Sequence, residues 1–339
     1  MEQTKGVSSF AGLPDLASEK LGGKALIASD EFFAPKENLL KEGRGIFIPG
    51  KFTENGKWMD GWESRRKRIQ GYDWCIIKLG VKGIIKGVDI DTNHFLGNHP
   101  PYGSVDASMV IEEPDTDEFL SKNIQWIEIL PKSPLNPGSQ NLFSINSSDN
   151  FTHVRLNIYP DGGVARLRVY GEVIPEWKTN ETKGLIDLAA LINGGKVLVC
   201  NDMFFGSKDN LISPGRSKNM GDGWETKRKR IPGYDWTILK LVAPGEIKKI
   251  VVDTNFFKGN YPDSCSIEGC LNPNAEDDSL TYPEIEWKEI LPKIKLQGDF
   301  ENTFEKEIKN IGTVSHVRLN IFPDGGVSRL RLFGIPDEL

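Results

Sequence analysis

The sequence predicts an all-β protein made of two tandem jelly-roll β-sandwich domains related by internal duplication. Short runs rich in β-branched and aromatic residues recur along the chain, and Gly, Pro, Asn and Asp separate them, as in strands joined by tight turns. The chain also repeats itself once, so both halves are expected to form the same fold. About eight short strands in each half are most simply arranged as an antiparallel jelly roll.

The internal repeat is long and keeps its order throughout. Residues 60–79 match residues 222–241 at 15 of 20 positions, and residues 153–171 match residues 316–334 at 15 of 19. A period of this length indicates duplication of a whole domain and not a short-period solenoid. The predicted parts are a first domain over residues 1–176, a polar linker over residues 177–183 and a second domain over residues 184–339.

The individual elements are predicted from alternation and turn signals. The clearest strands are expected at residues 24–28, 74–79, 84–90 and 124–130. A hairpin is expected where residues 154–159 and 164–170 both alternate apolar and polar side chains. The turn between them supplies Pro first and Gly where φ must be positive. Residues 185–192 are expected to form a short helix or turn that ends at two glycines.

The composition excludes several classes of function. The 42 basic and 48 acidic side chains leave a formal charge of −6, which disfavours non-specific binding to nucleic acid or to an anionic membrane. The four cysteines are too few for a disulfide scaffold and form no CxxC pair. The sequence has no apolar run long enough for a transmembrane helix and no apolar signal region near its start. We therefore expect a cytoplasmic protein.

A charged loop is present in both halves, at residues 60–68 and residues 222–230. Its four consecutive basic residues are compatible with nucleic-acid binding or nuclear targeting, and also with a solvated loop that shields a sheet edge. A third interpretation is a binding loop, in which an Arg holds a substrate carboxylate through paired hydrogen bonds while a Glu transfers a proton. The residues of that interpretation are Arg68 and Arg230 for binding, and Glu63 and Glu225 for catalysis.

A second polar cluster follows a predicted strand in each half, with the sequence Asp-Thr-Asn at residues 91–93 and 253–255. Asp and Asn often cap turns at such positions. They also suit a urea-like ligand, because Asn offers a donor and an acceptor while Asp accepts hydrogen bonds from N–H groups. The candidate binding residues are Asp91, Asn93, Asp253 and Asn255.

The four histidines are of two kinds. His94 and His99 are replaced by aromatic residues in the second half, whereas His153 and His316 are equivalent and begin the same predicted strand. The equivalent pair is either structural or a general acid or base that works near neutral pH. In each half an Arg follows this His by two residues, so both side chains point to the same face of the predicted strand. The candidates are His153 and His316 for catalysis, and Arg155 and Arg318 for binding.

Metal and nucleotide motifs are missing from the sequence. It contains no HxH or HExxH pattern and no His/Cys cluster, so a metal site is not predicted. It also contains no GxSxG, no Walker loop and no GxGxxG after a strand. We therefore expect no metal and no cofactor.

The repeated motifs resemble the allantoicase family. They are Gly-Trp-Glu-x-x-Arg-x-Arg with Gly-Tyr-Asp-Trp, then Asp-Thr-Asn-x-Phe-x-Gly-Asn-x-Pro, then His-Val-Arg-Leu-x-Ile-x-Pro-Asp-Gly-Gly, each present twice. The resemblance covers roughly residues 12–335, and the length and acidic character are similar to a fungal member. It implies two jelly rolls similar to galactose-binding and discoidin-type modules. It also implies hydrolysis of allantoate to ureidoglycolate and urea, a step of purine breakdown for nitrogen recovery.

That reaction breaks the bond between the central carbon of allantoate and one ureido nitrogen. A site for it needs a cation for the carboxylate, for which Arg is the best match, polar groups for the ureido arms, and an acid and a base. The candidate residues supply these groups. A homo-oligomer is expected because the duplicated sandwich leaves spare sheet faces. The alternative interpretation is a non-enzymatic tandem module that binds a sugar-type ligand and gains avidity from its two copies.

Overall fold

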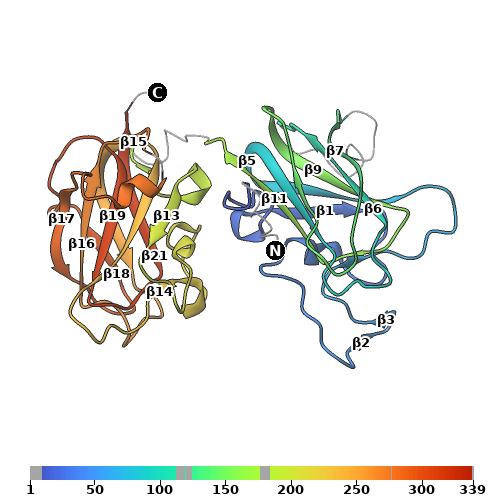
Figure 1. The fold of residues 1–339 in the computed structure, drawn as a ribbon, viewed down its shortest axis with the longest axis horizontal. Helices are drawn as coiled ribbons and strands as arrows, with labels where there is room; N and C mark the ends of the chain where they lie inside the picture. The colour runs from blue at the N-terminus through green and yellow to red at the C-terminus, as the bar shows by residue number, and fades with distance from the viewer. Residues whose placement is uncertain (1–9, 112–118, 120–123, 176–183, 276, 338–339) are drawn as a thin grey trace, which may run out of the picture. The chain divides into compact units, whose positions relative to one another are not determined.

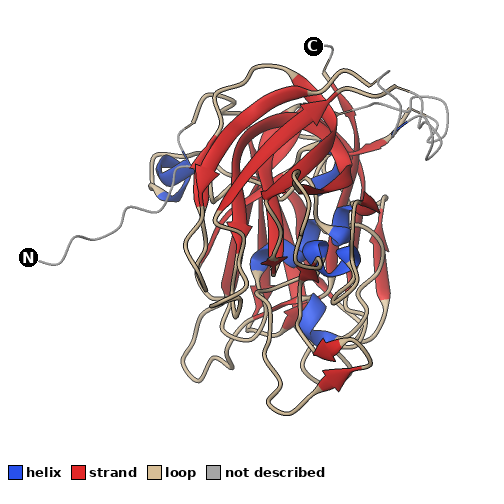
Figure 2. Cartoon of the chain, turned by 90° about the vertical axis from the view of Figure 1, so that its right-hand side faces the viewer, coloured by secondary structure: helices blue, strands red, loops and turns tan. Residues whose placement is uncertain are grey.

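The chain forms two compact units, Met1–Ile174 and Pro175–Leu339, which we call repeat 1 and repeat 2. The computed structural model describes residues 10–111, 119, 124–175, 184–275 and 277–337. Strands dominate both units, and elements η1 to η6 are short 3-10 turns (Figure 2), so the predicted all-β class is confirmed. The predicted linker over residues 177–183 lies outside the described residues. Among the described helices, none is long and apolar enough to cross a membrane.

Repeat 1 is a jelly roll in which one long strand serves both layers. Its larger strands are β1 (Lys24–Ala28), β5 (Asp73–Asp91), β6 (Tyr102–Ser108), β7 (Ile127–Pro134), β8 (Leu142–Ser144), β9 (Asn150–Tyr159) and β11 (Arg166–Val173). The first part of β5 pairs with β1 and β9, and its second part pairs with β11 and β8. The first layer has the strand order β1-β5-β9-β6-β7, and these strands are labelled in the blue-to-green unit of Figure 1.

Shorter elements of repeat 1 lie in its connections. They are η1 (Glu19–Leu21), η2 (Lys36–Leu40), β2 (Phe52–Thr53), β3 (Gly56–Lys57), β4 (Trp62–Glu63) and β10 (Gly163–Val164). Strand β4 pairs with β10, and β2 pairs with β3. Trp62 on β4 is fully buried, and its indole Nε1 donates to the carbonyl of Asp30 at 2.8 Å. The buried Trp therefore sets the position of Glu63, the next residue.

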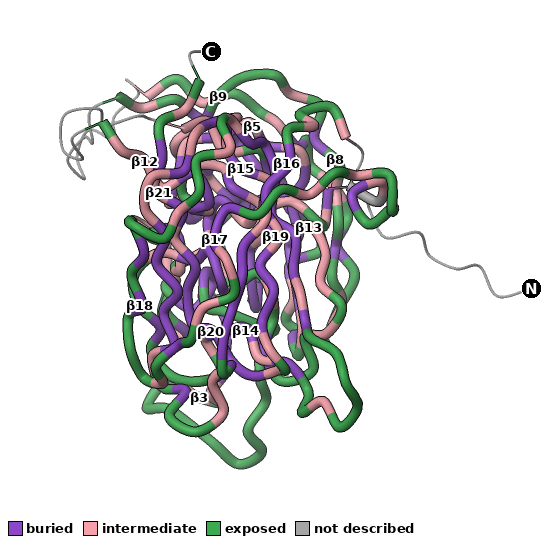
Figure 3. The backbone as a smooth tube through the Cα atoms, turned by 90° about the vertical axis from the view of Figure 1, so that its left-hand side faces the viewer, coloured by how far each residue is buried: buried purple, intermediate pink, exposed green. Residues whose placement is uncertain are grey.

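Repeat 2 has the same plan. Its strands are β12 (Ile186–Asp187), β13 (Lys196–Cys200), β14 (Trp224–Glu225), β15 (Asp235–Asp253), β16 (Ser264–Cys270), β17 (Lys288–Lys295), β18 (Glu301–Phe304), β19 (Val314–Phe322), β20 (Gly326–Val327) and β21 (Arg329–Pro336). Its 3-10 turns are η3 (Leu191–Asn193), η4 (Lys208–Ile212), η5 (Met220–Asp222) and η6 (Asp277–Thr281). Strand β15 bridges the layers as β5 does, and its buried residues line a continuous core (Figure 3).

The hairpin predicted over residues 154–170 does not form. Its first arm, in β9, pairs with β5 and β6, and its second arm, in β11, pairs with β5 and bridges to Asp15. The connecting residues cross from one layer to the other, where β10 pairs with β4. Alternation of apolar and polar residues shows which side chains face the core, but the same pattern is compatible with any antiparallel neighbouring strand.

The helix or turn predicted over residues 185–192 forms in the second half of that segment, where residues 188 and 189 are a turn. Residues 186 and 187 form β12, and only Leu191–Asn193 form a 3-10 turn. The predicted glycine stop is present, because Gly194 ends that turn with φ of 102°, a left-handed value that Gly adopts at little cost. Strand β12 forms because Ile186 and Asp187 pair with β21, a partner that is distant in the sequence.

Candidate functional site

Loops at one end of each sandwich carry most of the predicted polar residues, and we call this end the mouth. In repeat 1, Glu63 on β4 lies opposite Gly163 on β10. Three residues after Gly163, Arg166 on β11 lies opposite Asp91 at the end of β5, and three residues span roughly 10 Å of extended chain. Glu63 and Asp91 therefore belong to the same end of the sandwich.

An Arg–Asp ion pair lies in the mouth of repeat 1. Nε and Nη2 of Arg44 donate to the two carboxylate oxygens of Asp91 at 2.8 Å each, in the paired geometry that suits both groups. Asp91 is buried, whereas the Arg44 side chain is 48 % exposed. The hydrogen bonds with Asp91 raise the pKa of Arg44. Nη1 of Arg44 has no partner among the described residues, so an anionic ligand can reach it.

Asn93 connects this pair to a neighbouring loop. Its backbone N–H donates to Oδ1 of Asp91 at 2.9 Å, and its Nδ2 donates to the carbonyl of Gly45 at 2.7 Å. Both oxygens of Asp91 are therefore engaged within the protein. Asp91 thus contacts Arg44, and Asn93 contacts Asp91 and Gly45, while their predicted contact with a ureido group stays a prediction.

Repeat 2 reproduces this arrangement. Nε and Nη2 of Arg216 donate to the carboxylate of Asp253 at 3.0 and 3.1 Å. The backbone N–H of Asn255 donates to Oδ1 of Asp253 at 2.9 Å, and its Nδ2 donates to Oγ of Ser217 at 3.1 Å. The Arg216 side chain is 56 % exposed. Each mouth thus presents one guanidinium held by a buried carboxylate.

A buried Arg holds the loop that carries Arg44. Nη2 of Arg166 donates to Oδ2 of Asp60 at 2.6 Å, its Nη1 donates to the Asp60 carbonyl at 2.9 Å, and its Nε donates to the Gly43 carbonyl at 3.2 Å. Burial acts to raise the pKa of Asp60, but the Arg166 contacts lower it below its usual value. Arg329 binds Asp222 at 2.8 Å in the same way. These contacts position the exposed guanidinium.

The two glutamates predicted as acid or base, Glu63 and Glu225, are half-buried in the mouths. Nδ2 of Asn98 donates to Oε1 of Glu63 at 2.6 Å, and Nδ2 of Asn260 donates to Oε1 of Glu225 at 2.6 Å. Burial raises the pKa of Glu63, while the hydrogen bond from Asn98 acts to lower it. A Glu with a raised pKa is suited to accept and return protons nearer neutral pH.

The basic runs lie beside the mouths, and both predicted arginines are exposed there. Arg68 and Arg230 have no partner among the described residues. Arg230 lines an open pocket of about 730 Å³, together with Phe204 and Phe205. The backbone N–H of Phe205 donates to the carbonyl of Glu225 at 3.1 Å, so the pocket borders β14. The basic run of repeat 2 can therefore bind an anion next to the strand that carries Glu225.

The structure does not bring His153 to the mouth of repeat 1. His153 lies on β9, six residues before Tyr159, and six residues span roughly 20 Å of extended strand. The Tyr159 end of β9 leads into the mouth, so His153 is at the far end of the sandwich. Its side chain is buried, and its Nδ1 lies 2.9 Å from Oγ1 of Thr152.

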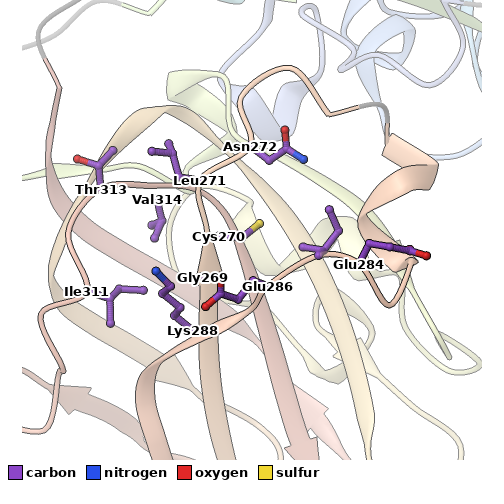
Figure 4. Close-up of a pocket in the computed structure, with 11 residues that line it drawn as sticks. Gly269, Cys270, Leu271, Asn272, Glu284, Glu286, Lys288, Ile311, Thr313 and Val314 are labelled. Carbon is purple, nitrogen blue, oxygen red and sulfur yellow. The ribbon is translucent and has the colours of Figure 1, made fainter.

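The equivalent His316 lies near a second pocket. His316 pairs with Cys270 on β16, and Cys270 lines a pocket of about 470 Å³ (Figure 4). Nδ1 of His316 lies 3.0 Å from Oγ of Ser315, and its side chain is fully buried. Burial raises the pKa of Cys270 to about 11, so this thiol is protonated and a poor nucleophile at neutral pH.

The candidate arginines of the same strands bind neighbouring carboxylates. Arg155 donates to Oδ2 of Asp106 at 3.0 and 2.8 Å, and Nε of Arg318 donates to Oε2 of Glu268 at 2.8 Å. Each guanidinium also lies about 5 Å from the centroid of a Trp ring. Their charge is therefore balanced on the outer face of their own sheet.

Sequence reasoning missed the two arginines that the mouths present. Arg44 and Arg216 each follow a Gly, at the same offset of 172 that relates the starts of the two halves. That repeated Gly-Arg pair was an available signal. Among the described residues, no group of three or more His, Cys, Asp or Glu side chains is placed to hold a metal ion.

Comparison with known proteins confirms the family resemblance. The family described as Allantoicase repeat matches residues 14–174 and again residues 186–337. A probable allantoicase 1 of Burkholderia mallei is 50 % identical over 324 residues, covering 96 % of this chain and 95 % of that protein. A probable allantoicase of Photobacterium profundum is 49 % identical over 330 residues, covering 97 % and 98 %.

A solved structure supports the same assignment. The crystal structure of allantoicase from Saccharomyces cerevisiae matches with a TM-score of 0.79 and 41 % identity, covering 95 % of this chain and 92 % of that chain. The similarity thus extends to bacterial and fungal proteins and spans both repeats. This chain therefore belongs to the allantoicase family, with one allantoicase repeat in each half.

Proposed function

We propose that this chain hydrolyses allantoate to ureidoglycolate and urea at a mouth of its sandwiches. One observation carries the proposal: each mouth combines an exposed guanidinium on a buried carboxylate with a half-buried Glu on an adjoining loop. The similar proteins of Burkholderia and yeast bear the name allantoicase, and allantoate is the substrate that this name implies.

The proposed mechanism uses residues of the mouth only. Arg44 or Arg216 binds the substrate carboxylate through its outward-facing nitrogen, while Arg68 or Arg230 adds positive charge at the edge. Glu63 or Glu225 takes a proton from a water molecule as the water oxygen attacks the central carbon. The carbon–nitrogen bond to one ureido group breaks in the same step, since the central carbon already has four bonds, and the leaving nitrogen takes the electron pair and a proton to give urea.

Urea release from allantoate tests this proposal. We expect the purified chain to release urea, and we expect E63Q, E225Q or both to lower kcat by about 10²- to 10⁴-fold, the range for lost acid–base catalysis. E307Q is the matched control, because Glu307 is exposed and has no hydrogen bond or ion pair with the described residues. Normal kcat in both mouth variants would contradict the proton-transfer role. Loss of activity on adding a chelator would show a metal requirement.

We assign supporting roles to the residues at the far end. His153, His316, Arg155 and Arg318 are expected to stabilise the outer sheet faces, because their partners lie on those faces. H153N should therefore lower the unfolding midpoint and leave KM for allantoate unchanged. A raised KM in a stably folded H153N would give His153 a place in the site.

Two further proposals concern partners and location. Duplicated sandwiches have outer sheet faces that a second copy can cover, so we propose a cytoplasmic homo-oligomer that binds neither nucleic acid nor membrane. Light scattering should give a multiple of 37.9 kDa.

Glycan binding without urea release would instead favour the sugar-type binding module.

A further inference from the structure

The residue after Asn93 differs in kind between the two mouths. It is His94 in repeat 1 and Phe256 in repeat 2. Both have left-handed backbone conformations, with φ of 66° and 70°, which are costly for a ring-bearing residue. Both side chains are exposed. The same strained turn therefore presents an imidazole at one mouth and a phenyl ring at the other.

His94 lies next to the loop that carries Arg44. The hydrogen bond from Asn93 to the carbonyl of Gly45 is 2.7 Å long, and Arg44 and His94 are the chain neighbours of these two residues. The His94 ring also lies 5.8 Å from the ring of Phe47. An imidazole and a guanidinium, both exposed, therefore flank one hydrogen bond.

The same mouth carries an arm that repeat 2 does not have. Asp60 follows Arg44 by 16 positions, whereas Asp222 follows Arg216 by six. The arm, residues 46–58, includes β2 and β3 and extends from the body of repeat 1 (Figure 1).

Apolar side chains of the arm border the mouth. Ile46 and Phe47 are 57 % and 37 % exposed, and Phe47 contacts His94. The backbone N–H of Ile46 donates to Oδ2 of Asp60 at 2.9 Å, which joins the arm to the buried Arg166 network. Apolar walls around a few polar groups are typical of small-molecule sites. Repeat 1 thus has apolar side chains of the arm and an additional titratable group, His94, at its mouth.

We propose, building on the function proposed above, that repeat 1 carries the catalytic mouth and that His94 is its general acid. Glu63 takes a proton from water, and the water oxygen bonds to the central carbon of allantoate. The bond from that carbon to a ureido nitrogen breaks, its electron pair goes to nitrogen, and the His94 imidazolium gives that nitrogen a proton. Return of the Glu63 proton to His94 through solvent completes the cycle.

Repeat 2 has most of this machinery but lacks the acid. Arg216 and Glu225 match Arg44 and Glu63, so its mouth can bind the same anion. Phe256 has no proton to donate. The mouth of repeat 2 therefore binds substrate without turning it over.

Four variants of the full chain test the assignment, with urea release from allantoate as the readout. H94N keeps a residue that tolerates the left-handed turn, and H94F installs the side chain of repeat 2. Both should lower kcat by about 10²-fold or more with little change in KM. F256Y alters the equivalent turn of repeat 2 and should leave kcat and KM unchanged. R44K should raise KM, because the Lys ammonium cannot form the paired hydrogen bonds that the Arg guanidinium forms with a carboxylate.

The outcomes separate this inference from the function on which it rests. If the wild-type chain releases no urea, the proposed function fails. If it releases urea and both H94N and H94F retain wild-type kcat, His94 is not the acid. If E225Q lowers kcat as much as E63Q does in a stably folded chain, catalysis is not confined to repeat 1. Unchanged thermal unfolding of H94N would show that its lost activity is chemical.

Discussion

The two repeats share one scaffold but differ at their mouths. Strands β5 and β15 each span 19 residues and bridge both layers, and each mouth holds an Arg–Asp pair and a Glu–Asn pair. Repeat 1 alone has the arm over residues 46–58 and an imidazole at the exposed turn. It also buries Asp89, where repeat 2 has Val251.

This difference separates what supports the fold from what acts on a ligand. Residues with the same contacts in both repeats, such as Arg166 and Arg329, hold loops in place. His94 and Phe256, which differ in kind, are exposed at the mouths. Variants made at equivalent positions therefore distinguish support from chemistry within one chain.

The largest expected effect on stability comes from the buried arginines. R166M leaves the carboxylate of Asp60 and several carbonyls without their donor. Breaking such a pair costs about 3–5 kcal/mol, and R329M should cost a similar amount in repeat 2. Denaturant unfolding measures both losses. R66M, at an exposed Arg without a partner among the described residues, should change stability by less than about 0.5 kcal/mol. An unchanged free energy of unfolding in R166M would show that the loop is held by other contacts.

Asp89 gives repeat 1 a pH dependence that Val251 cannot give repeat 2. Burial raises the pKa of Asp89 to about 6, and the neighbouring Asp91 adds to the rise. The protonated form therefore favours folding, so its contribution is complete below about pH 4 and is lost as pH rises through 6. The loss is on the order of 3 kcal/mol. D89N should flatten unfolding free energy between pH 4 and 7, and an unchanged slope would contradict this account.

The Glu–Asn pair predicts a smaller, directional effect on the pH profile. The hydrogen bond from Asn98 acts to lower the pKa of Glu63. N98A should therefore raise that pKa and move the acid limb of kcat to higher pH, since Glu63 must be ionised to accept a proton. N260A in repeat 2 is the matched variant and should leave the limb in place if repeat 1 is the active half. If the acid limb of kcat moves with N260A and not with N98A, the catalytic mouth is that of repeat 2.

The arm should contribute least to stability. Phe52 is 69 % exposed at its tip, so F52S should change the unfolding free energy by less than about 0.5 kcal/mol. A larger loss, measured by denaturant unfolding, would show that the arm is packed in solution.

Much of the fold could be predicted from the sequence, but the site only partly. The duplication and strand composition predict two β-sandwich repeats, and the repeated Trp-Glu motif predicts Glu63 and Glu225 as residues of interest. The role of Arg44 was missed because its partner Asp91 is 47 residues away. The sequence also does not predict that both oxygens of Asp91 accept hydrogen bonds from Arg44.

Strand character and the buried face of each strand follow from the sequence alone, because both depend on residues close together in the chain. Which strands become neighbours depends on long-range contacts in the folded protein. The segments 154–159 and 164–170 have hairpin alternation but lie in different layers, and His153 and Glu63 lie at opposite ends of one sandwich. Alternation of apolar and polar residues predicts which face of a strand is buried but not which strand pairs with it. The positions of the charged groups relative to one another therefore depend on long-range strand pairing.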